Sequence, residues 1–116
     1  MKVTMRRQKS IAAVSEMTVT GVQARARVNR FLLSQVGSQF CAGEPELDVV
    51  RELWRVPILM VTPGFVAGQV GEATVSARTR EIEGHTDIEE IYAAADTLRK
   101  RHQAAIKAAF IQARKG

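Results

Sequence analysis

Residues 53–78 have the sequence LWRVPILMVTPGFVAGQVGEATVSAR, which predicts two strands joined by a turn at residues 62–64. The first strand, over 53–61, has apolar side chains at alternate positions, namely Trp54, Val56, Ile58 and Met60. The second, over 68–78, places Ala73, Val75 and Ala77 on one face, which is typical of a half-covered antiparallel strand. Because Pro57 cannot donate a backbone hydrogen bond, we expect the first strand to lie at an edge or to be bonded on one side there.

Apolar residues with helical spacing lie on both sides of this pair of strands in the sequence. Over 21–36 the apolar residues recur at intervals of three and four, namely Ala24, Val28, Phe31, Leu32 and Val36. Over 86–113 the same spacing recurs, and Thr86 with Glu89 predicts a capping box at its start. An unbroken helix of this length is about 40 Å long. We expect it either to break near 99–102 or to pack its C-terminal half on another chain.

These elements predict an α+β fold, with a small antiparallel sheet of two to three strands. The sheet packs against the N-terminal helix and the long C-terminal helix. A third short strand begins near Ile82, and residues 40–47 are expected to form an extended connection. We divide the chain into a flexible basic arm over 1–17 and a single domain over 18–116.

Composition restricts the class of protein. Apolar residues make up 46% and charged residues 25% of the 116 residues, as in ordinary globular proteins. Cys41 is the single cysteine, which fits a reducing compartment. The basic N-terminus is not followed by an apolar stretch long enough for a signal peptide. We therefore expect a cytoplasmic protein, without a membrane partner.

Catalytic, metal-binding and cofactor-binding motifs are not evident. Cys41 and His85 are a conceivable nucleophile and base, but no flanking residue supports that pairing. His85 and Asp87 lack the further Cys or His ligands that a metal site needs. We expect no enzyme and no cofactor.

Three candidate surfaces remain. A self-association surface, most simply of a dimer, would lie on the last helix and comprise Leu98, His102, Ile106 and Phe110. A salt-sensitive contact to nucleic acid or another polyanion would comprise Arg6, Arg7, Lys9, Arg25, Arg27 and Arg30. A pocket between sheet and helix would lie near Trp54 and Met60, in a small enzyme or ligand carrier.

Residues 75–82, VSARTREI, resemble the V-D-A-x-T-G-E-V end of PepSY-type modules, with 54–58 as the preceding strand. Small bacterial immunity proteins that neutralise toxins have a similar α-β-β-α layout. The resemblance implies a protein that acts by binding another protein. The leading hypothesis is therefore a non-enzymatic binding or regulatory module, of the antitoxin or immunity type. A nucleic-acid accessory protein and a small enzyme or ligand carrier are the alternatives.

Overall fold

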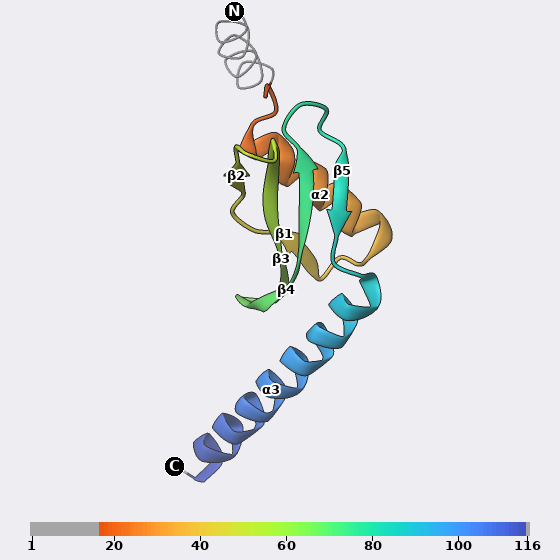
Figure 1. The fold of residues 1–116 in the computed structure, drawn as a ribbon. Coiled ribbons are helices and arrows are strands. Elements are labelled where there is room, and N and C mark those ends of the chain that lie inside the picture. Colours follow the sequence, from red (N-terminus) through yellow and green to blue (C-terminus); the bar gives the residue numbers. More distant parts are fainter. Residues whose placement is uncertain (1–16, 116) are drawn as a thin grey trace, which may run out of the picture.

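The computed structural model describes residues 17–115, except the side chains of Ile106, Ala109, Phe110 and 112–115. Within that range the chain is an α+β domain with two helices and a curled antiparallel sheet (Figure 1). The helices are α2 (Gly21–Gln35) and α3 (Ile88–Lys115). The strands are β1 (Phe40–Ala42), β2 (Glu46–Asp48), β3 (Leu53–Thr62), β4 (Phe65–Ser76) and β5 (Ile82–His85). The α+β class is confirmed.

The sheet has five strands, so the expected two to three is wrong. Its order is β1-β3-β4-β5, and β2 pairs with the same edge of β3 as β1. The two further strands lie within residues 40–48, where the sequence predicts only an extended connection over 40–47. Each is only three residues long, too short to show an alternating pattern. Pairing with β3 defines them, and pairing is a tertiary property.

Strand β3 lies inside the sheet rather than at its edge. It pairs with β4 along its whole length, and on its other side with β1 at Ile58–Met60 and β2 at Leu53–Arg55. Pro57 falls where the neighbouring strand changes from β1 to β2. The missing N–H of proline is therefore accommodated at a gap in the ladder, and the Pro57 carbonyl still accepts a bond from Gly43 N at 2.8 Å.

Helix α2 covers one face of the sheet. Its first turn has a capping box, in which Thr20 Oγ1 accepts from Gln23 N and Gln23 Oε1 accepts from Thr20 N. The buried stripe of the helix meets the buried face of β3 and β4. The fully buried core there comprises Ala24, Val28, Leu32, Val56, Ile58, Ala73 and Val75. This confirms the faces that alternation predicts for β3 and β4.

Helix α3 begins on the same face and crosses the glycines of β4. A Cβ on Gly71 would lie 2.9 Å from the Thr86 side chain, and one on Gly68 would lie 3.1 Å from both Leu98 methyl groups. These two positions without a side chain let α3 approach the strand backbone closely. Tyr92 Oη donates a 2.6 Å hydrogen bond to the Val36 carbonyl, which ties α3 to the end of α2.

The expected capping box at Thr86 is replaced by a contact to the sheet. Thr86 Oγ1 accepts from Glu72 N at 2.9 Å and donates to Glu72 O at 3.3 Å. The first helical bond runs from Ile91 N to the Asp87 carbonyl. The hydroxyl therefore extends the hydrogen bonding of β4, where strand β5 has ended, rather than capping the helix.

Helix α3 is continuous over 28 residues, about 42 Å. The alternative of a break near 99–102 is therefore wrong. The helix leaves the sheet at the β3–β4 hairpin and continues away from it (Figure 1).

Candidate functional site

The C-terminal part of α3 projects beyond the sheet. The last contacts that seat it on β4 and the hairpin are made by Leu98 and His102. Beyond His102 every residue whose side chain the structure describes is exposed, namely Gln103, Ala104, Ala105, Lys107, Ala108 and Ile111. Ile111 is 47% exposed, although it is a large apolar side chain. This segment has apolar surface that the described residues leave uncovered.

The end of α3 from residue 97 on, which includes the last turn seated on the sheet and the projecting segment, has formal charges of one sign. From residue 97 to the C-terminus the sequence has six basic residues and no Asp or Glu. The six are Arg99, Lys100, Arg101, Lys107, Arg114 and Lys115. The nearest carboxylate in the sequence, Asp96, pairs with Lys100 at 3.1 Å. The projecting helix is therefore cationic as well as partly apolar, which favours a partner with acidic groups.

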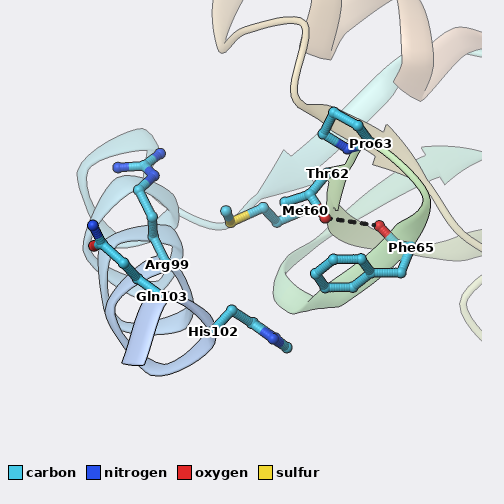
Figure 2. A pocket seen from close by; sticks show the side chains of 7 residues that line it. All are labelled: Met60, Thr62, Pro63, Phe65, Arg99, His102 and Gln103. Atoms are coloured by element: carbon cyan, nitrogen blue, oxygen red, sulfur yellow. Dashed lines mark hydrogen bonds between the residues drawn. The ribbon is translucent and has the colours of Figure 1, made fainter. Parts of the chain in front are cut away.

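A groove of about 390 Å³ lies where α3 leaves the sheet, between the helix and the tip of the β3–β4 hairpin (Figure 2). The hairpin side is largely apolar and the helix side is polar. The lining residues are Met60, Thr62, Pro63, Phe65, Arg99, His102 and Gln103. Phe65 is 42% exposed at the mouth, and Met60 is buried.

His102 connects the two sides of this groove. Its Nε2 lies 3.0 Å from the Ala67 carbonyl oxygen, and its ring centroid lies 5.2 Å from that of Phe65. A carbonyl oxygen only accepts hydrogen bonds, so Nε2 carries the proton in this contact. The bond fixes the histidine ring and holds the helix against the hairpin.

Comparison with protein families, curated proteins and solved structures gave no match. The resemblance to PepSY-type and immunity modules therefore stays a hypothesis. Function has to be argued from the geometry of this chain.

The four self-association candidates divide into two pairs. Leu98 and His102 contact the chain's own β4 and hairpin, at Gly68 and Ala67. Leu98 is half-buried by these intrachain contacts. The side chains of Ile106 and Phe110 lie outside the described residues. Self-association through the last helix stays a prediction, and the described side chains beyond His102 are exposed.

The polyanion candidates on α2 do not all share one side of the helix, since Arg27 and Arg30 are neighbours but Arg25 is not beside Arg30. Arg25 Nε donates to the Ala42 carbonyl at 3.1 Å, and its guanidinium lies 3.6 Å from Glu44. Arg25 therefore contacts the β1 edge, whereas Arg30 is exposed and lies about 140° around the helix from it. Arg27 is half-buried. Arg6, Arg7 and Lys9 lie outside the described residues.

The two pocket candidates lie far apart along β3. Met60 lines the groove, and six residues before it Trp54 Nε1 donates to the Val19 carbonyl at 2.8 Å. Trp54 also packs over Gly21, at the start of α2. Sequence reasoning missed Phe65, Arg99 and Gln103 as groove residues. An exposed aromatic after the Pro63-Gly64 turn was the available signal, but only the path of α3 brings Phe65 against His102 at the groove.

Cys41 and His85 are separated within the sheet. Cys41 lies on β1 and pairs with Leu59 of β3, whereas His85 lies on β5 and pairs with Ala73 of β4. Strands β3 and β4 therefore lie between the strands of the two residues. The His85 ring instead lies 4.7 Å from that of Phe31. Among the described residues no group of three Cys, His, Asp or Glu side chains could hold a metal ion. Within residues 17–115 no helix has the length and apolar character needed to span a membrane.

Proposed function

We propose that this chain is a non-enzymatic protein-binding module, and that the projecting part of α3, over 103–115, is the segment that binds. The single observation that carries the proposal is the exposed, cationic and partly apolar character of this segment beyond the sheet. The partner is a protein with an apolar groove that is bordered by carboxylates. An α-helix placed in such a groove is a recurrent mode of recognition.

The apolar component favours a protein over nucleic acid. Phosphate contacts need only the charges of Lys and Arg, and they leave Ile111 and the exposed alanines without cover. A protein groove covers both kinds of surface. The separation of Cys41 from His85 supports a binding role rather than nucleophilic catalysis, because their two strands are not neighbours.

Capture of partners by the tagged chain from an extract of its own cells tests this proposal. The variants are Lys107→Glu, which reverses an exposed charge of the segment, and Ile111→Glu, which places a charge in the apolar surface. Arg30→Glu is the matched control, because it reverses an exposed charge on α2. The extract is treated with nuclease, and the captured protein is then purified and titrated with each variant.

We expect a stoichiometric acidic protein that binds the wild-type chain and Arg30→Glu with similar affinity. Both α3 variants should bind it at least about tenfold more weakly, because charge pairing and apolar burial at an interface each contribute that much or more. Equal affinity of the α3 variants would contradict the proposal. Loss of all captured material after nuclease treatment would support the nucleic-acid alternative instead.

A further inference from the structure

The groove between α3 and the β3–β4 hairpin has the dimensions and the lining of a small-molecule site. Its volume of about 390 Å³ lies within the usual range for ligand pockets. Such pockets combine apolar walls with a few polar groups that fix the orientation of the ligand. This groove has that composition, since apolar side chains come from the hairpin and polar ones from the helix (Figure 2).

The apolar wall is already built without a ligand. Met60 is 3% exposed, so its position is set by the core, and Pro63 restricts the backbone of the turn beside it. Phe65 contacts the His102 ring yet keeps 42% of its surface exposed. A partly exposed aromatic beside a concave apolar surface gains by being covered.

The polar wall has an unbalanced positive charge. Arg99 Nη1 lies 3.9 Å from Asp96 Oδ1, which is too long for a hydrogen bond. The other oxygen of that carboxylate lies 3.1 Å from Lys100 Nζ, so Lys100 is the closer partner of Asp96. None of the residues that line the groove is acidic. The guanidinium of Arg99 therefore has donors available for an anion at the groove.

We propose that this groove binds a small, soluble amphipathic carboxylate. Its head group is bound by Arg99, with Gln103 one turn further along the helix as a neutral donor. Its apolar tail lies along Met60, Pro63 and Phe65. His102 is a positioning residue. Its bond to the Ala67 carbonyl sets the distance between the helix and the hairpin, and this distance keeps the groove open.

Calorimetric titration of the full chain with decanoate tests this site, with decanol as the uncharged probe of the same tail. Arg99→Gln removes the charge and keeps a shorter polar side chain that can still donate hydrogen bonds. Arg101→Gln is the matched control, because Arg101 is exposed on the same helix and does not line the groove. Phe65→Ser tests the tail at an exposed position of the hairpin.

We expect saturable binding of one decanoate per chain, with decanol weaker. Arg99→Gln should weaken decanoate about tenfold and leave decanol unchanged, since it removes a charge-assisted bond. Arg101→Gln should bind like the wild type, and Phe65→Ser should weaken both probes. Absence of saturable decanoate binding, or the same affinity in Arg99→Gln as in the wild type, would overturn the proposal. Equal losses for decanoate and decanol in Arg99→Gln would overturn the role of the head group.

Discussion

The Leu98 side chain lies directly over Gly68, where a Cβ would be 3.1 Å from each of its methyl groups. This contact seats α3 on β4 one turn before His102, whose Nε2 bonds to the Ala67 carbonyl of the same strand. It also determines where the groove opens, because His102 lies one turn further along the helix.

Replacing Gly68 with Val should therefore displace the helix and destabilise the domain. We expect overpacking to lower the free energy of unfolding by about 1–3 kcal/mol, and the φ of +157° at Gly68 adds backbone strain that the Leu98 side chain does not influence. Urea denaturation followed by circular dichroism measures it. Leu98→Ala supplies the control, because in the double variant the added methyl groups have space. A cost of Gly68→Val that is the same in both backgrounds would show that the two residues do not compete for that space.

Asn29 protects the outer edge of β1. Its Oδ1 accepts a 2.8 Å hydrogen bond from Ala42 N, on a residue that is 1% exposed. Asn29→Ala leaves that donor without its partner, so the free energy of unfolding should fall by about 1–3 kcal/mol. Asn29→Asp keeps an acceptor and should stay closer to the wild type. A similar loss in both variants, measured by urea denaturation, would refute the bond's contribution.

The Glu52–Arg78 pair predicts a dependence of stability on pH. Arg78 Nε and Nη2 lie 2.9 and 2.8 Å from the two carboxylate oxygens, and these hydrogen bonds lower the pKa of Glu52 from its ordinary value of 4.5. The folded state therefore holds the charged form more firmly than the unfolded state does. The stabilisation is present above pH 4.5 and is lost as the pH falls through the lower folded pKa.

Glu52→Gln should remove this component. We expect the stability difference between wild type and variant to be largest at neutral pH and to shrink in acid, in urea denaturations at a series of pH values. Glu81→Gln is a suitable control, since Glu81 is an exposed carboxylate on the loop after β4. A difference that is independent of pH would show that the carboxylate charge makes no contribution through Arg78.

Self-association through the last helix stays open to a direct test. The three–four spacing of the sequence predicts that Ile106 lies on the same side of the helix as Leu98 and His102. Ile106→Glu should convert a dimer into monomers without unfolding the sheet, as read by light scattering after gel filtration. Because each copy is cationic here, the dimer should strengthen as salt rises. A wild-type chain that is already monomeric would contradict this prediction, and an unchanged dimer mass would move the interface elsewhere.

Much of the fold could be predicted where periodicity extends over several residues. The helix over 21–36, the two long strands and the last helix all have such patterns, and the structure confirms them with shifted ends. Residues 40–42 and 46–48 have no pattern of their own. They become strands because β3 offers unpaired backbone groups on that side.

The candidate site was less accessible to sequence reasoning. The sequence predicts functional roles for Met60, Leu98 and His102, but it assigns Met60 to a pocket near Trp54 and the other two to an interface with another chain. Their positions here depend on Gly68 and Gly71, which allow α3 to approach β4. Gly68 and Gly71 of β4 lie against Leu98 and Ile91 of α3, which are distant in the sequence. No local sequence pattern reveals these contacts.

The sequence by itself determined the elements with a strong period, the single cysteine and the acid-free cationic end of the chain. These are properties of neighbouring residues, and short-range geometry and composition suffice to specify them. Only the tertiary structure decided that β3 is an inner strand, that Thr86 bonds to β4, and that α3 and the β3–β4 hairpin line a common groove, where His102 lies against Phe65. Those outcomes depend on contacts between residues far apart in the chain, which form when packing and hydrogen bonding across the whole domain are satisfied together.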